Sequence, residues 1–529
     1  METTNLSKIR REKMLNTINE IKKNVSDEET LNNLSLIENE LTKKKYGLIW
    51  EEHEERVDKE LETQIPTFID ATDKQIRECN DKFNFLLEGD NLHSLYLLNK
   101  THRGKIDLII IDPPYNTGSK EFMYNDTYVD SEDGYRHSKW LSFMNKRLRL
   151  AKELLSDKGF IYINIDQNEF SQLKLLCDEI FGESNYVNEI VWQKLSASKA
   201  QSIFFSNLHE KILVYRKSEN AVMKKLYTEV DENDKNYPYI EENTGRKYGS
   251  FDFTQSGQGT AKYFGDKLLE PPKGKHWIWS QEKIDEGMKN GTIIFTSNGL
   301  PRVKRYLDNK KGNPIGDLWV NNGVSNLSAN DKERVGFDTQ KPLTMIQRIL
   351  QTMPENITVL DFFAGSGTTG HGVLLQNTID DGNRNFILCT NNENNICEEV
   401  TYKRLYDLSK GEIKGKQIDF NLKYYKTSYV PRMNTDDENL SKNLMVNIKN
   451  LIQLENGIEI DDKIVRVILT EEEIDKFTSN ERELDKCEKL YISSDILLTS
   501  KQSQIFKDYN IELFIIPEYY FEDEIREVA

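Results

Sequence analysis

Two short apolar runs, one in each half of the chain, end in segments that cannot continue a regular helix or strand. The first run is Ile106–Ile111, followed directly by Asp112-Pro113-Pro114-Tyr115. The second is Thr358-Val359-Leu360, followed by Asp361-Phe362-Phe363-Ala364-Gly365-Ser366-Gly367-Thr368-Thr369-Gly370. Paired prolines fix φ and lack N–H donors, whereas glycines allow sharp turns and a close approach of backbone to ligand. We therefore predict two buried strands that each end in a functional loop.

The segments around both runs alternate between helical and strand-like patterns. Helices are predicted over Ser138–Ser156 and Phe170–Phe181, near Leu343–Met353 and up to Leu375. Strands are predicted over Phe160–Ile165, Ile212–Tyr215, Phe386–Cys389 and Asn421–Val430. Such alternation favours a mostly parallel sheet covered by helices. We expect an α/β fold in which residues 81–217 and 336–430 build one sheet.

Three regions lie outside this alternation. Residues 1–80 show helical spacing and predict a helical region, either a hairpin packed on its neighbour or a dimer or partner interface, with Pro66 at its boundary. Residues 218–335 are rich in Gly, Asn, Tyr and Lys and predict an irregular inserted domain with Trp277 and Trp279 in its core. Residues 431–441 are typical of a linker, and the short β-rich runs that follow predict a small α/β domain within 431–529.

The charge of the chain is unevenly distributed. A net charge of -17 over 529 residues argues at first against nucleic acid, whose phosphates attract Lys and Arg. Residues 194–338, however, contain 23 Lys and Arg against 19 Asp and Glu, whereas the remainder contains 48 against 69. This basic stretch inside an acidic chain is compatible with a segment that reads DNA.

Other compositional features favour a cytoplasmic protein. No apolar run approaches the ~18 residues that a membrane helix needs, and Met1–Lys8 contains no apolar signal segment. The five cysteines have neither metal-ligand nor disulfide-framework spacing. We therefore expect a reduced environment, no metal site and no membrane partner.

The glycine turn predicts a cofactor site. Asp361 before the turn, with Phe362 and Phe363, suits a cofactor that has a cationic and a planar part, and S-adenosylmethionine is such a molecule. Dinucleotide-binding enzymes share the glycine spacing but need an acid about 20 residues further on. The next strand ends in Thr390-Asn391-Asn392-Glu393, where only Glu393 is acidic. A nicotinamide-dependent oxidoreductase remains an alternative, but it leaves Asp112–Tyr115 without a role.

Asp112-Pro113-Pro114-Tyr115 can grip a planar amino group. The nitrogen of an exocyclic amine on adenine or cytosine is a poor nucleophile because its lone pair is delocalised into the ring. The Asp112 carboxylate and the carbonyl of Pro113 or Pro114 can accept its two N–H bonds and favour a tetrahedral nitrogen. Tyr115 can stack on a base that has left the helix.

Both motifs, in this order, resemble those of the permuted, beta-class amino-directed DNA methyltransferases, and most closely the modification subunits of type III restriction-modification systems. The resemblance covers roughly residues 83–217 and 300–410. It implies a Rossmann-like, mostly parallel seven-stranded sheet, with a target-recognition domain in the insertion and the target base near Asn164-Ile165-Asp166. It also implies double-stranded DNA as the substrate, and a separate nuclease or translocase subunit for any restriction activity.

The resemblance assigns roles residue by residue. It gives the catalytic role to Asp112, Pro113, Pro114 and Tyr115. It gives cofactor binding to Asp90, Gln340, Lys341, Pro342, Asp361, Phe363, Gly365, Gly367, Thr368 and Asn391, with Asp90 at the adenine end and Thr339-Gln340-Lys341-Pro342 beside the methionine end. One departure concerns the ribose, because Thr390 or Asn391 stands where many relatives carry an acid.

The sequence is compatible with alternative functions. Asp112 in the first motif position favours adenine N6 as the target, whereas serine in that position is typical of cytosine-N4 enzymes. A different class is a DNA-binding specificity subunit with weak or no transferase activity. The intact Asp112, Tyr115, Gly365 and Gly367 argue against that class.

Overall fold

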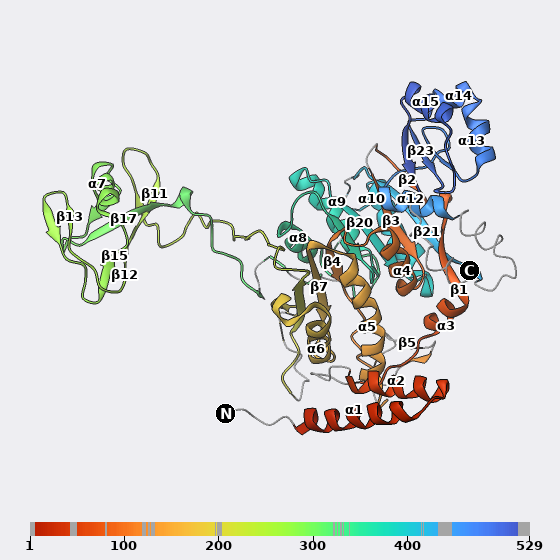
Figure 1. Cartoon of the computed structure of the whole chain (residues 1–529). Helices are drawn as coiled ribbons and strands as arrows, with labels where there is room; N and C mark the ends of the chain where they lie inside the picture. The colour runs from red at the N-terminus through yellow and green to blue at the C-terminus, as the bar shows by residue number, and fades with distance from the viewer. Residues whose placement is uncertain are drawn as a thin grey trace. The chain divides into compact units, whose positions relative to one another are not determined.

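The computed structural model describes residues 6–42, 50–79, 82–118, 123–124, 127–128, 133–195, 197, 204–320, 323–324, 326–327, 331, 333–337, 339–413, 415, 417–431 and 447–516. The chain forms two compact units (Figure 1). The larger comprises Met1–Val222, Leu318–Gln347 and Glu355–Ala529, and the smaller comprises Met223–Asp317 and Arg348–Pro354.

The larger unit is built on an 11-stranded sheet. Its main path runs β1 (Gln64–Asp70), β21 (Asn421–Pro431), β3 (Phe83–Glu88), β20 (Asn385–Thr390), β19 (Thr358–Asp361), β4 (Ile106–Ile111), β7 (Leu155–Ile165), β9 (His209–Arg216), β8 (Tyr186–Gln193) and β18 (Leu318–Trp319), with β2 (Ile76–Arg77) paired to β21. The six strands from β21 to β7 are mutually parallel, and β9 is antiparallel to both of its neighbours. The two halves of the chain therefore build one α/β sheet, as predicted.

The sheet is larger than the predicted seven strands, and its edges explain the difference. Strands β1, β2 and β21 extend one side, and β18 extends the other. Strand β1 lies within residues that were predicted to be helical, where helix α3 (Arg56–Thr63) ends and the chain pairs with β21. Pro66 lies inside this strand rather than at a boundary, since an edge strand tolerates a residue without an N–H donor. Strand β18 was assigned to the insertion because two residues carry too little pattern to indicate a strand.

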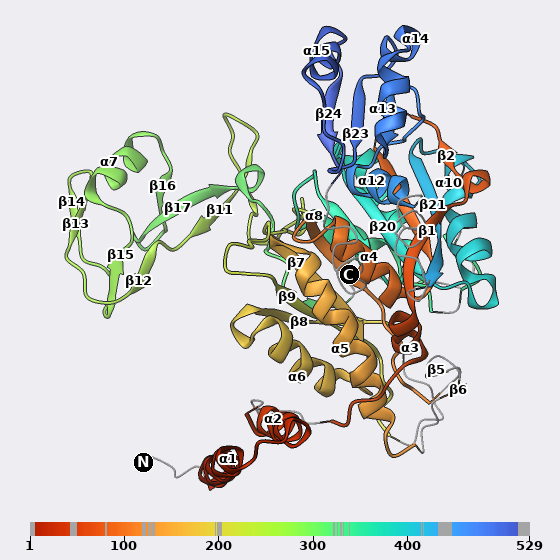
Figure 2. The same cartoon turned by 45° about the vertical axis from the view of Figure 1, so that its right-hand side comes forward.

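Helices cover both faces of this sheet. Helices α4 (Asn91–Thr101), α5 (Arg136–Leu154) and α6 (Phe170–Phe181) pack in a row, α5 between the other two (Figure 2). The connection β4–α5–β7 runs along the sheet in the opposite direction to β19–α9–β20, where α9 is Thr368–Asp380. Right-handed crossovers therefore put α5 and α9 on opposite faces. The strand order reverses between β19 and β4, which creates a crevice at their carboxyl ends.

The terminal regions have their own structures. Helices α1 (Leu6–Asn24) and α2 (Glu28–Thr42) pack together as the predicted hairpin, and the Lys22 Nζ donates to Ser35 Oγ at 2.9 Å and Glu38 Oε2 at 2.6 Å. Towards the C-terminus the parallel strands β22 (Val465–Ile468), β23 (Lys489–Ile492) and β24 (Glu512–Ile515) combine with helices α13 (Glu471–Thr478), α14 (Glu481–Leu484) and α15 (Ser500–Asp508). Helix α12 (Ile448–Asn456) packs on α4 and β1. Most of the predicted linker, residues 432–441, lies outside the described residues.

The smaller unit is mostly antiparallel β-structure. It contains β10 (Tyr239–Ile240), β11 (Lys247–Phe251), β12 (Thr254–Ser256), β13 (Lys262–Phe264), β14 (Lys267–Leu269), β15 (Lys275–Trp277), α7 (Gln281–Lys289), β16 (Ile293–Phe295) and β17 (Pro301–Tyr306). Trp277 is buried in its core with Phe253, Phe264 and Ile284, and Trp279 packs against this cluster. Both tryptophans are therefore core residues, as predicted.

Two observations bear on the expected reduced environment and on the expected absence of a membrane partner. All five cysteines are free, and four of them are buried. Within the described residues, no helix combines the length and the apolar character needed to cross a membrane.

The leucine pair on α6 tests the packing of the sheet face. Leu176 is fully buried in the main core, whereas the side chain of Leu175 is 44% exposed. We expect Leu176→Ala to lower the free energy of unfolding by about 2–5 kcal/mol, because it leaves a cavity. The control Leu175→Ala should change it by less than about 1 kcal/mol. Chemical denaturation followed by circular dichroism measures both, and equal effects would contradict the assigned packing.

Candidate active site

A cavity of about 790 Å³ lies at the carboxyl ends of β4 and β19 in the larger unit. Most of the predicted site residues line it, although they come from distant parts of the sequence: Asp90, Asp112, Pro113, Pro114, Tyr115, Lys341, Asp361, Phe363, Gly365, Thr368 and Asn391. Asn164 and Asp166, at the end of β7, also line it. The sheet therefore brings both motifs to one site.

The Asp112 carboxylate belongs to a compact ionic cluster. Its Oδ1 accepts a hydrogen bond from the Tyr115 hydroxyl at 2.8 Å, and its Oδ2 lies 2.9 Å from the Lys341 Nζ. The same Nζ donates to the Tyr115 hydroxyl oxygen at 2.8 Å and lies 3.3 Å from Glu210 Oε2. Lys194 pairs with the other oxygen of Glu210. One cation and two carboxylates thus contact the Tyr115 hydroxyl, and Lys194 extends the cluster through Glu210.

The charged groups in this cluster shift one another's pKa values. Burial raises the pKa of Asp112 above its usual range, and Lys341 opposes that effect. Burial would also raise the pKa of Glu210, but Lys341 and Lys194 together lower it. Burial disfavours the charged form of Lys341, yet Asp112 and Glu210 raise its pKa. Lys341 is therefore the cation that opposes the rise in the Asp112 pKa that burial causes.

Hydrogen bonds to the residues around it fix the loop after β4. The indole N–H of Trp140 donates to the Pro114 carbonyl at 2.7 Å. Asn116 has a positive φ of 57°, and its amide donates to Glu169 Oε1 at 2.5 Å and to the Arg136 carbonyl at 3.2 Å. Glu169 is fully buried, and burial raises its pKa to about 8. These bonds set the direction of the chain immediately after Tyr115.

The glycine turn is closed by Asp361. Its Oδ1 accepts from the Phe363 N–H at 3.0 Å, and its Oδ2 accepts from the Thr369 hydroxyl at 2.6 Å. Burial raises the pKa of Asp361 to about 7. Gly365 and Gly367 have φ of 45° and 71°, which disfavours residues with a side chain. The Asp361 carboxyl thus holds the turn while it faces the cavity.

Three predicted cofactor residues lie outside the cavity lining. Gln340 is buried, donates to the Glu333 carbonyl at 2.9 Å and accepts from the Val335 N–H at 3.0 Å, so it shapes its own loop. Pro342 is buried ahead of α8 (Leu343–Gln351). Gly367 is the N-cap of α9, and a Cβ there would lie 3.2 Å from Thr401 Cγ2. Lys341 lines the cavity, but its contacts are with the Asp112 cluster.

The position expected to hold a ribose acid carries no acid next to the strand. Strand β20 ends at Thr390, and Thr390, Asn391 and Glu393 all line the cavity. The Gly89 N–H donates to the Thr390 carbonyl at 3.1 Å, so the loop that carries Asp90 lies directly beside this strand end.

Sequence reasoning missed Glu210, Trp140 and Arg147. Glu210 is buried at the start of an apolar strand, and Arg147 is buried on the apolar stripe of α5. A charged residue at an inward position was the available signal for both, because burial of an ion requires a partner. Among the described residues, no group of three or more His, Cys, Asp or Glu side chains is arranged to hold a metal ion.

Comparison with known proteins finds one family for the central part of the chain. A DNA methylase family profile matches residues 106–401. The chain is 32% identical to the Mod subunit of the type III restriction-modification enzyme StyLTI of Salmonella typhimurium, over 65% of this chain and 58% of that subunit. It is 33% identical to the type II methyltransferase M.KpnI of Klebsiella pneumoniae, over 60% of this chain and 82% of that enzyme. The chain therefore spans less than two thirds of the Salmonella subunit.

Two glycines with similar backbone angles test how the turn is packed. Gly104 has a φ of 67° and no atom near an added Cβ, whereas an added Cβ at Gly367 would press on Thr401. We expect Gly104→Ala to cost about 1 kcal/mol through the left-handed backbone alone. Gly367→Ala should cost more, because the contact is added. Thermal unfolding measures both, and an equal loss would contradict the tight packing of the turn on Thr401.

Proposed function

Because the chain belongs to the DNA methylase family, we propose that it transfers a methyl group from S-adenosylmethionine to N6 of a flipped adenine in double-stranded DNA, as the modification component of a restriction-modification system. The single observation that carries this proposal is the meeting of Asp112-Pro113-Pro114-Tyr115 and the Asp361 turn at one cavity. In the sequence the grip precedes the cofactor turn, which is the permuted order.

The lining of the cavity fits this cofactor. The Asp361 carboxylate suits the cationic groups of S-adenosylmethionine, the carboxylates of Asp90 and Glu393 suit the donors of its adenosine half, and the Phe363 ring suits its planar base. A cation beside Asp361 would keep that carboxyl ionised at neutral pH, although burial raises its pKa to about 7. Gly365 lets the backbone approach the ligand closely. When bound, the cofactor supplies an electrophilic methyl group.

The grip uses Asp112 and a proline carbonyl. The Asp112 carboxylate accepts one N–H of the adenine amino group and a carbonyl accepts the other, which favours a tetrahedral nitrogen. The Pro114 carbonyl already accepts the Trp140 indole N–H, so the Pro113 carbonyl is the better second acceptor. The sequence motif left the carbonyls of Pro113 and Pro114 open, and this contact favours Pro113.

Asp112 can receive the base without losing its ion pair. Each carboxylate oxygen has two acceptor positions, and Tyr115 and Lys341 each occupy one. The Tyr115 ring then stacks on the base while its hydroxyl stays anchored to the cluster. The methylated nitrogen is acidic and loses its extra proton afterwards, so no separate strong base is required.

The proposed function suggests roles for the remaining parts of the molecule. The smaller unit, with its basic segment, is assigned to target recognition. The hairpin α1–α2 or the C-terminal α/β part is assigned to self-association. The similarity to Mod subunits supports a separate restriction subunit as a partner.

Loss of the carboxylate tests the reaction. We expect Asp112→Ala to abolish methylation, since one acceptor for the amino group is removed, while S-adenosylmethionine binding survives. Incubation with DNA and labelled cofactor, followed by sequencing of the modified bases, measures methylation, and calorimetry measures binding.

The exposed Asp419→Ala on the surface is a matched control that should methylate normally. Methylation by Asp112→Ala near the normal rate would contradict the grip. If the wild-type product contained N4-methylcytosine, the target base would be cytosine rather than adenine. Absence of methyl transfer by the wild-type protein would favour a specificity subunit.

The Asp112 cluster predicts a pH dependence. Lys341 lowers the pKa of Asp112, so Lys341→Met should raise that pKa and leave the carboxyl protonated over a wider range. The acidic limb of the pH profile of kcat should then move to higher pH by about 1–3 units. Lys194→Met is the matched control, because Lys194 contacts Glu210 rather than Asp112, and its limb should move less. An unmoved limb in Lys341→Met would contradict the assigned role of Lys341.

A further inference from the structure

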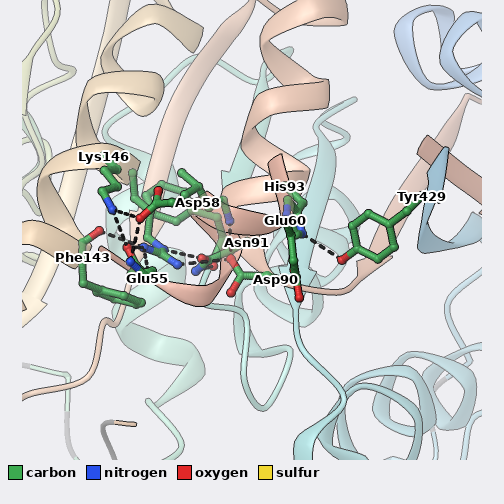
Figure 3. Close-up of polar contacts among 12 residues, drawn as sticks. Glu55, Asp58, Glu60, Asp90, Asn91, His93, Phe143, Lys146 and Tyr429 are labelled. Carbon is green, nitrogen blue, oxygen red and sulfur yellow. Dashed lines mark hydrogen bonds and ion pairs between the residues drawn. The ribbon is translucent and has the colours of Figure 1, made fainter. Parts of the chain in front are cut away.

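A segment remote from both motifs forms one wall of the cavity. Glu55, Arg56, Val57 and Glu60, at the start of α3, all line it. Figure 3 shows this wall, where Glu55 and Glu60 lie near Asp90 and Asn91, the residues that begin α4. Neither motif nor composition assigned these residues a role.

Arg147 of α5 fixes this wall. Its side chain is only 1% exposed, and its guanidinium lies over the Phe143 ring at 3.6 Å from the centroid. Its Nη1 donates to both Glu55 oxygens at 3.0 Å, and its Nη2 donates to Asp90 Oδ1 at 3.1 Å. A buried guanidinium is stable only with such partners, so the start of α3 and the start of α4 are held together.

The same network reaches the glycine turn. The Arg147 Nε donates to Asn91 Oδ1 at 2.5 Å, and the Asn91 amide donates to the Phe362 carbonyl at 2.7 Å. Lys146, the neighbour of Arg147, pairs with Glu55 at 3.5 Å and with Asp58 (Figure 3). The position of the α3 wall is therefore coupled to the loop that carries Asp361 and Phe363.

Glu60 presents a carboxylate at this end of the cavity. Its Oε1 pairs with the Arg56 Nε at 3.1 Å, and its Oε2 lies 3.8 Å from His93 Nε2. His93 is fully buried, and its Nδ1 shares a hydrogen bond with the Tyr429 hydroxyl at 3.0 Å (Figure 3). The Nε2 has no hydrogen-bond partner among the described residues, and burial lowers the pKa of His93. Glu60 lines the cavity and is too far from this nitrogen for a hydrogen bond, so its carboxylate retains capacity for a ligand.

We propose that Glu60 binds the adenosine half of the cofactor, with Glu55 and Arg147 as positioning residues that hold the α3 wall. The proposal rests on the proposed function and names a further contact of the same site. The donors of that half are the 6-amino group and the ribose hydroxyls, and a carboxylate accepts from either. Strand β20 ends in Thr390 and Asn391 without a carboxylate, and the Asp90 loop adjoins that end. Glu60 of α3 is then an acid for the adenosine half in addition to Asp90 and Glu393, which also line the cavity.

The test separates the two halves of the cofactor. Calorimetry on the full chain measures the Kd of S-adenosylmethionine and of 5′-methylthioadenosine, which keeps the adenosine half but lacks the amino-acid part. We expect Glu60→Gln to weaken both by about tenfold, because a charge-assisted hydrogen bond is lost. Glu62→Gln, an exposed carboxylate of the same helix outside the cavity, is the matched control and should bind both normally.

Unchanged binding of both ligands by Glu60→Gln would overturn the proposal and leave the methyltransferase function intact. A loss for S-adenosylmethionine alone would also overturn it, because the contact would then be to the amino-acid half. If the wild-type chain binds neither ligand, the proposed function fails as well.

The positioning role has its own readout. Glu55→Gln should raise the KM for S-adenosylmethionine severalfold and leave kcat at saturating cofactor near the wild-type value, since the grip on the base is untouched. Arg147→Lys should do the same to a smaller degree than Arg147→Met, and thermal unfolding checks that each variant is folded. If a variant loses kcat in proportion to its loss of folded protein and its KM is unchanged, the network has only a structural role.

Discussion

The parallel pairing of β4 with β19 is the constraint on which the site depends. Val359 pairs with Leu108 and Leu360 with Ile109, so the two strands end side by side although their sequences are far apart. At the opposite end, Asp107 accepts from the Thr358 N–H at 3.1 Å, which helps to set this register. Because the helices after β4 and β19 cover opposite faces, the chain leaves a crevice at the ends of these two strands. The cavity is thus a consequence of the sheet topology, and the two motifs supply side chains that line it.

Two ionic clusters then give this cavity its chemistry. One is centred on Lys341 and the other on Arg147, and each joins elements that the sheet alone leaves separate. Burial makes an unpaired charge costly, so each cation stays in place only while several acceptors surround it. The Lys341 cluster holds the Asp112 carboxylate, and the Arg147 cluster holds the start of α3 beside Asp90 and Asn91. Preorganised charge of this kind needs little rearrangement when a substrate arrives.

The sequence predicted those parts whose signal is local. Helix α6 was predicted at its observed bounds, and β4, β19 and β20 within a residue or two, because apolar periodicity and flanking glycines or prolines mark them. Strands β1 and β18 were not predicted. Pro66 interrupts the pattern of β1 and β18 has only two residues, so only the pairing of β1 with β21 and of β18 with β8 makes them strands. The motifs predicted which loops meet. They did not predict Glu210, Arg147 or the bond from Trp140 to Pro114, because such contacts depend on register and helix docking.

The boundary of the family match has a physical meaning. The match begins at residue 106, yet Asp90, Glu60 and Glu55 precede it and line the same cavity. Strand β3 and helix α4 must lie beside β20 and α5 for the sheet to be complete, and this placement carries Asp90 to the cavity. Strand β1 pairs with β21 at the edge, which brings α3 back over the same end. Under the proposed cofactor assignment, a carboxylate for the adenosine half can therefore come from any chain segment that the edge strands deliver to the cavity, and its absence from β20 does not leave the pocket without one.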